Sequence, residues 1–106
     1  MKGTNLGEFQ EIVMLSILLL GDNAYGVSIQ DELDHRMHRK NSRGALQTAL
    51  NRLEEKGLIS SRYGEPTPER GGRRKRYYEV TNAGLATLQD AKTLREGMWK
   101  LIPKLI

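Results

Sequence analysis

The sequence contains no cysteine. This absence excludes a disulfide framework, a thiolate metal site and a cysteine nucleophile. Long hydrophobic runs are also absent: the longest, residues 12–20, has nine residues, whereas a membrane-spanning helix needs about 20. Glu8 and Glu11 precede this run, where a secretory signal peptide would carry basic residues. We therefore expect a cytoplasmic protein in which residues 12–20 belong to a buried helix.

The size and the charge distribution limit the possible classes of protein. A chain of 106 residues can form one modest core but is too short for two independent domains. Its net charge is +4, and residues 36–76 hold twelve of the seventeen Lys and Arg residues but only four of the thirteen Asp and Glu residues. A basic middle segment between acidic flanks predicts a surface that binds a polyanion. A solvated basic surface is the alternative.

The hydrophobic pattern predicts three helices, a hairpin and a fourth helix. Helices are expected at residues 6–20, 24–37, 43–56 and from 82 nearly to the end, and strands at 58–63 and 75–80. The expected N-caps are Asp22 or Asn23 for the second helix, Ser42 for the third and Thr81 or Asn82 for the fourth. This order is that of a winged helix-turn-helix. The predicted fold is therefore mainly α-helical with a small β-hairpin.

The third predicted helix has a polar line opposite an apolar stripe. The stripe has the spacing of one buried face: Leu46, Ala49, Leu50 and Leu53. The opposite face then carries Arg43, Gln47 and Asn51, which are four residues apart. Arg can bind guanine O6 and N7 in the major groove, while Gln and Asn can bind adenine N6 and N7. Three flanking residues are expected to contact phosphates: Ser42, Thr48 and Arg52. An ordinary solvated helix face is the alternative.

The second half of the predicted hairpin loop is strongly basic. Five Lys and Arg residues surround two glycines there: Arg70, Gly71, Gly72, Arg73, Arg74, Lys75 and Arg76. Glycines let a loop lie close to a DNA backbone, and arginines can neutralise phosphates or enter a narrow minor groove. Such a cluster can also be a basic tail or a localisation signal. Its place between two strands favours the DNA-binding wing.

Several segments resemble the PadR family of bacterial transcriptional regulators over residues 6 to about 88. They are residues 6–9 (LGEF), 24–26 (AYG), 42–46 (SRGAL), 52–59 (RLEEKGLI), 71–78 (GGRRKRYY) and 81–84 (TNAG). The resemblance implies a ligand-responsive homodimeric repressor that binds an inverted-repeat DNA operator. It also implies that the third helix enters the major groove and that the wing contacts the backbone or the minor groove.

Tyr25 and Gln47 differ in how they match the family motifs. Tyr25 matches the family motif and is a candidate DNA contact, with a packing role as the alternative. The family usually has Tyr where this chain has Gln47, so that contact is not carried over. We expect Gln47 to make a polar contact to a base or a phosphate instead.

The fourth predicted helix has more apolar surface than its own chain can cover. We expect residues 1–81 to form the DNA-binding unit and residues 82–106 a C-terminal dimerisation helix, in one compact body. The expected dimer interface consists of Leu88, Leu94, Met98, Trp99, Leu101 and Ile102, and the resemblance also implies that the C-terminal helix makes the dimer. Trp99 is expected in the dimer core. A further hypothesis is that Trp99 also lines an effector site for a small planar apolar or phenolic molecule. Pro103 should end the helix.

Other functions have weaker support in the sequence. Asp31, His35 and His38 have a spacing that metal ligands can use, but they lack a fourth ligand. No phosphate-binding glycine loop or nucleophile motif is present, so neither enzymatic activity nor a cofactor or metal is expected. A winged helix that binds RNA or a protein partner is the second alternative. The polar line favours duplex DNA, because the major groove of A-form RNA is too deep and narrow.

Overall fold

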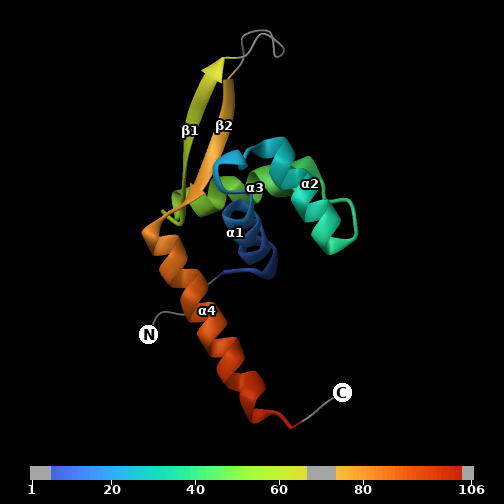
Figure 1. Ribbon diagram of the computed structural model, residues 1–106, viewed down its shortest axis with the longest axis vertical. Helices are drawn as coiled ribbons and strands as arrows, with labels where there is room; N and C mark the ends of the chain where they lie inside the picture. Colours follow the sequence, from blue (N-terminus) through green and yellow to red (C-terminus); the bar gives the residue numbers. More distant parts are fainter. Residues whose placement is uncertain (1–5, 67–73, 104–106) are drawn as a thin grey trace.

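The computed structural model describes residues 6–66 and 74–103 and has the element order expected of a winged helix (Figure 1). The elements are α1 (Glu8–Leu20), the 3-10 helix η1 (Gly21–Asn23), α2 (Gly26–Met37), α3 (Arg43–Glu55), β1 (Ile59–Pro66), β2 (Arg74–Val80) and α4 (Asn82–Leu101). All four helices and both strands of the sequence prediction are present. The predicted fold class, mainly α with a small hairpin, is confirmed.

Helix α1 lies at the centre of the core and contacts α2, α3 and β2. Its residues Val13, Met14 and Ile17 are almost fully buried. The apolar stripe predicted for α3 faces them, because all four of its residues are buried: Leu46, Ala49, Leu50 and Leu53. Full burial of such an aliphatic side chain stabilises the fold by about 1.5–3 kcal/mol. This core fixes α3 with its polar side outward.

Helix α2 begins later than predicted, and neither Asp22 nor Asn23 caps it. The N-cap is Tyr25, whose backbone N–H donates to Ser28 Oγ at 3.0 Å. Tyr25 also forms an isolated β-bridge with Tyr77, and the N–H of Tyr78 donates to the carbonyl of Ala24 at 2.8 Å. These contacts with β2 hold Ala24 and Tyr25 in an extended conformation. They explain why the helix cannot begin at residue 24.

The turn between α2 and α3 is tied to α2 by polar side chains. Asp34 Oδ1 accepts from Asn41 N at 2.9 Å and from Asn41 Nδ2 at 3.0 Å. Gln30 Nε2 donates to the carbonyl of Asn41 at 2.6 Å. The Asn41 backbone N–H, followed by its side chain, lowers the pKa of Asp34 below the ordinary value of 3.8. Gln30 and Asp34 are both half-buried because they bind this turn.

The hairpin is antiparallel and longer than predicted, since β1 continues from Tyr63 to Pro66. Its register pairs Ile59 with Val80 and Ser61 with Tyr78, with an irregularity between Tyr63 and Pro66. Figure 1 shows the hairpin pointing away from the helices at the end of the molecule opposite α4. This is the position of a wing.

The start of α4 is packed closely against the base of the hairpin. Thr81 caps the helix, because its Oγ1 accepts from Gly84 N at 3.1 Å and donates to the carbonyl of Gly57 at 2.7 Å. A Cβ on Gly84 would lie 2.1 Å from the carbonyl oxygen of Leu58. Only glycine therefore allows α4 to approach Leu58, the residue before β1, this closely.

The rest of α4 projects away from the core (Figure 1). Leu88 and Ala91 are buried, whereas residues 92–103 are exposed. An ion pair between Arg95 and Glu11 joins α4 to α1. The helix ends at Leu101, and the following residue is extended, as expected before Pro103. None of the described helices has both the length and the apolar character needed to span a membrane.

Candidate nucleic-acid interface

The outer face of α3 carries all six polar residues that the sequence analysis assigned to it. Ser42 caps the helix by accepting from Ala45 N at 3.0 Å. The other five follow along the helix, and all six are exposed: Ser42, Arg43, Gln47, Thr48, Asn51 and Arg52. The buried stripe on the opposite face determines this orientation. Donors and acceptors for base edges and phosphates are therefore presented on a rigid helix.

Two of these side chains form a pair. Gln47 Nε2 donates to Asn51 Oδ1 at 2.9 Å, one turn further along α3. The Gln47 carbonyl oxygen and the Asn51 amide N–H groups are not used in this hydrogen bond. An acceptor and a donor are what a bidentate contact to the major-groove edge of adenine requires.

The described part of the wing carries three of the predicted basic residues. Arg74 is exposed, and its guanidinium carbon lies 5.5 Å from the centre of the Tyr63 ring. Lys75 Nζ lies 4.1 Å from the centre of the Tyr25 ring. Arg76 instead pairs with Glu54 of α3, with Nη2 2.9 Å from Oε1. The remaining predicted wing residues lie outside the described residues: Arg70, Gly71, Gly72 and Arg73.

Tyr25 packs between α2 and the wing. Its ring meets Tyr77 edge-on, with the centroids 5.7 Å apart and an angle of 67° between the planes. It also lines a cavity of about 400 Å³ between α2, α3 and β2, which includes Arg43, Gln47 and Arg74. Tyr25 therefore packs against the wing at a place that borders the basic surface, and its contact with DNA stays a prediction.

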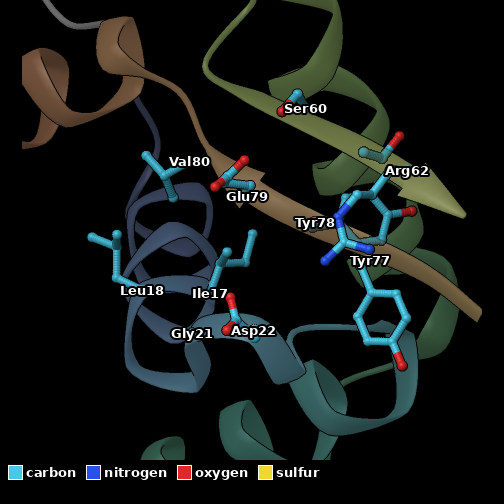
Figure 2. A pocket seen from close by; sticks show the side chains of 11 residues that line it. Ile17, Leu18, Gly21, Asp22, Ser60, Arg62, Tyr77, Tyr78, Glu79 and Val80 are labelled. Carbon is cyan, nitrogen blue, oxygen red and sulfur yellow. The ribbon is translucent and has the colours of Figure 1, made fainter. Parts of the chain in front are cut away.

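A second cavity, of about 270 Å³, lies between α1, η1 and the hairpin (Figure 2). Figure 2 shows Asp22 and Glu79 on opposite sides of it, with Ile17 between them. Arg62 lies at the same cavity, 5.2 Å from the centre of the Tyr77 ring. Its two carboxylates make this cavity poorly suited to phosphate. The basic surface between α3 and the wing is the better candidate for nucleic acid.

Helices α1 and α4 carry many exposed apolar side chains among charged ones. The exposed large side chains there are Leu15, Leu18, Leu19, Leu85, Leu94, Met98, Trp99, Leu101 and Ile102. Trp99 is 63% exposed and, with Leu15 and Leu85, lines a cavity of about 360 Å³. Leu88 differs from the other predicted interface residues, because only 8% of it is exposed and it belongs to the core of its own chain.

The predicted metal alternative finds no support in the described residues. Within residues 6–66 and 74–103, no group of three or more His, Cys, Asp or Glu side chains is placed to hold a metal ion. Asp31, His35 and His38 do not converge on a site there.

The sequence did not predict the two partners of Arg76, which are Glu54 and Ser61. No local pattern connects these residues, because they come from three different elements.

Comparison with known proteins identifies related regulators. A family model described as "Transcriptional regulator PadR-like family" matches residues 14–90. A PadR family transcription regulator from Clostridium difficile R20291 is 31% identical; the match covers 88% of this chain and 93% of that one, with a TM-score of 0.67. A transcriptional regulator from Clostridium thermocellum is 29% identical, with 92% and 90% coverage and a TM-score of 0.68. No curated protein matches this sequence.

Proposed function

Because the chain belongs to the PadR-like family of transcriptional regulators, we propose that it is a sequence-specific repressor that binds an inverted-repeat operator as a homodimer. The family consists of DNA-binding regulators rather than enzymes. The observation that carries the proposal is the polar face of α3 directly beside a basic wing. A helix of this kind fits the major groove, while cations of the wing reach the adjacent backbone.

The residues of α3 have separate roles in this proposal. Arg43, Gln47 and Asn51 contact base edges, where one good bidentate contact discriminates by about 1–3 kcal/mol. The flanking residues bind phosphates and fix the orientation without specifying sequence: Ser42, Thr48 and Arg52. In the wing, Arg74 and Lys75 contact the backbone, together with Arg70 to Arg73, which lie outside the described residues.

The homodimer would form through α4 and α1. The exposed apolar side chains of these two helices support this, since a contiguous apolar surface of this kind is uncommon on a monomer. A two-fold axis through such an interface places the two α3 helices about 34 Å apart, one turn of DNA. The cavity beside Trp99 adjoins this interface and would take a small planar apolar or phenolic effector.

Fluorescence anisotropy of the purified protein tests DNA recognition. The protein is titrated with DNA from upstream of its own gene and with a scrambled duplex of equal length, at several salt concentrations. We expect a preference for the native duplex of about 10³ or more. Equal and steeply salt-dependent binding would mean that only phosphates are contacted. If duplex RNA competes with the DNA equally well, the alternative of an RNA-binding protein is favoured. If no DNA binds at low salt, the alternative of a protein partner is favoured.

Matched variants connect this binding to α3. Arg43→Ala should weaken binding to the preferred duplex, whereas Lys100→Ala, which removes a positive charge from exposed α4, should have a much smaller effect. If the two variants lose affinity equally, Arg43 has no specific role.

Sedimentation of Leu94→Glu tests the dimer. A charge at this exposed apolar position should convert the dimer to a monomer, while Leu94→Met should leave it unchanged. Titration with planar phenolic compounds, followed by Trp99 fluorescence, tests the effector site. A wild-type monomer at micromolar concentration would refute the dimer, and unchanged Trp99 emission with every compound would refute the effector site.

A further inference from the structure

We propose that Glu54, Ser61 and Arg76 form a clamp that fixes the angle between the wing and α3, and that Arg76 is a positioning residue instead of a DNA contact. This inference rests on the proposed function, because it concerns how the DNA-binding surface is held in shape. It reassigns one cation of the wing that the sequence pattern groups with the others.

The clamp is a closed set of three hydrogen bonds between three elements. Ser61 Oγ on β1 donates to Glu54 Oε2 on α3 at 2.7 Å. Arg76 on β2 donates from Nε to Ser61 Oγ at 3.0 Å and from Nη2 to Glu54 Oε1 at 2.9 Å. Each carboxylate oxygen of Glu54 therefore has its own partner. Charge-assisted bonds of this length are stronger than neutral ones.

The guanidinium of Arg76 is also surrounded by aromatic rings. Its central carbon lies 5.5 Å from the centre of the Tyr78 ring and 5.8 Å from that of Tyr63. The Arg76 side chain is 38% exposed and that of Glu54 33%. Turning Arg76 towards a phosphate would break both of its hydrogen bonds and leave the half-buried Glu54 carboxylate without its cation, with only the Ser61 hydroxyl as a partner. Arg74 is free of such a constraint, because it is exposed and forms no ion pair within the described ranges.

The position of the clamp explains its mechanical effect. The base of the hairpin is held by backbone bonds from Tyr78 N to the Ala24 carbonyl and from Thr81 N to the Leu58 carbonyl. Above this base, the Glu54–Arg76 contact is the one ion pair among the described residues that joins α3 to the hairpin. Glu54 lies one turn of α3 after Asn51, so the clamp links the wing directly to the proposed base-contacting face.

Removal of the Glu54 charge distinguishes the clamp from simple electrostatics. Glu54→Gln takes one negative charge from the DNA-binding side, which by itself raises affinity for DNA. It also weakens the clamp, which lowers affinity if the wing angle matters. We expect about tenfold weaker binding to the preferred duplex, equivalent to about 1.4 kcal/mol. The matched control is Glu55→Gln, an exposed neighbour with the same change of charge. It should bind as tightly as wild type or more tightly.

A double-mutant cycle tests the role of Arg76. In the clamp, Arg76→Gln and the combination Glu54→Gln with Arg76→Gln should bind about as weakly as Glu54→Gln alone, because each change breaks the same unit. Ser61→Ala removes only the bridging hydroxyl and should lower affinity by a smaller factor in the same direction. If Arg76 contacts a phosphate instead, Glu54→Gln frees it and strengthens binding, whereas Arg76→Gln weakens binding and abolishes the gain from Glu54→Gln.

The outcomes separate this inference from the proposed function. If wild type does not prefer its native duplex over the scrambled one, the proposed function fails. If wild type has that preference and Glu54→Gln binds like Glu55→Gln, the clamp is refuted and the proposed function stands. Thermal unfolding of each variant identifies any loss of the fold, and Ser61→Ala keeps the test valid if Glu54→Gln does not fold.

Discussion

The contact between Gly84 and the base of the hairpin predicts that Gly84→Ala destabilises the protein. Alanine is normally better than glycine in a helix by about 1 kcal/mol. Here the added Cβ would lie 2.1 Å from the Leu58 carbonyl oxygen, 2.8 Å from Val80 Cγ1 and 3.0 Å from Met14 Cε. The first contact is with backbone, so α4 itself must move. Overpacking of this kind costs about 1–3 kcal/mol, so after the helix gain of about 1 kcal/mol we expect a net loss of up to about 2 kcal/mol in the free energy of unfolding.

Gly44→Ala is the matched control for this prediction. Gly44 also lies in the first turn of a helix with a hydroxyl N-cap, but a Cβ there meets nothing within 4 Å. Gly44→Ala should therefore leave stability unchanged or raise it by up to about 1 kcal/mol. Urea unfolding of both variants at one protein concentration measures the difference, since association changes apparent stability. Equal stability of the two variants would refute the close approach of α4 to β1.

Three further predictions concern α2 and α3. Because hydrogen bonds from Asn41 lower the pKa of folded Asp34, its contribution to stability should be complete above pH 3.8 and disappear as the pH falls through the folded value. In urea unfolding, Asp34→Asn should therefore be less stable than wild type at pH 7, and the difference in stability should be smaller in acid. Asp31→Asn, on the exposed side of α2, should show little change in the same assay. Ser42→Ala should lose about 0.5–2 kcal/mol in the same assay, because it removes the N-cap of α3. Gln47→Ala should bind the native duplex more weakly in anisotropy; unchanged affinity would mean that Gln47 contacts neither base nor phosphate.

The elements that could be predicted are those determined by local patterns. The stripe of α3 and its Ser42 cap depend on residues within one helix, and both are confirmed. The predicted start of α2 was wrong because a tertiary contact decides it: the β-bridge between Tyr25 and Tyr77 accompanies an extended backbone at Ala24 and Tyr25. A cap assignment from sequence considers only neighbouring residues and cannot include such a contact.

The candidate site shows the same division between local and distant contacts. The exposed face of α3 followed from its periodicity. The basic run of the wing, however, suggested five equivalent cations, and the structure shows that Arg76 is bound to Glu54, 22 positions earlier in the chain. Charge density in a sequence indicates that a surface can bind a polyanion. It does not show which cations are already neutralised inside the fold.

The junction at Gly84 also bears on how an effector could act under the proposed function. The close contact with Leu58 and Val80 means that α4 cannot tilt without moving the base of the hairpin. If α4 forms the dimer, a ligand beside Trp99 that tilts this helix by about 10° would displace an α3 helix about 17 Å from the two-fold axis by about 3 Å. A shift of that size is comparable to the length of a hydrogen bond, so the two α3 helices of the dimer could not keep their base contacts at the same time. Release from DNA then requires rotation of a rigid unit but no unfolding of the wing or of α3.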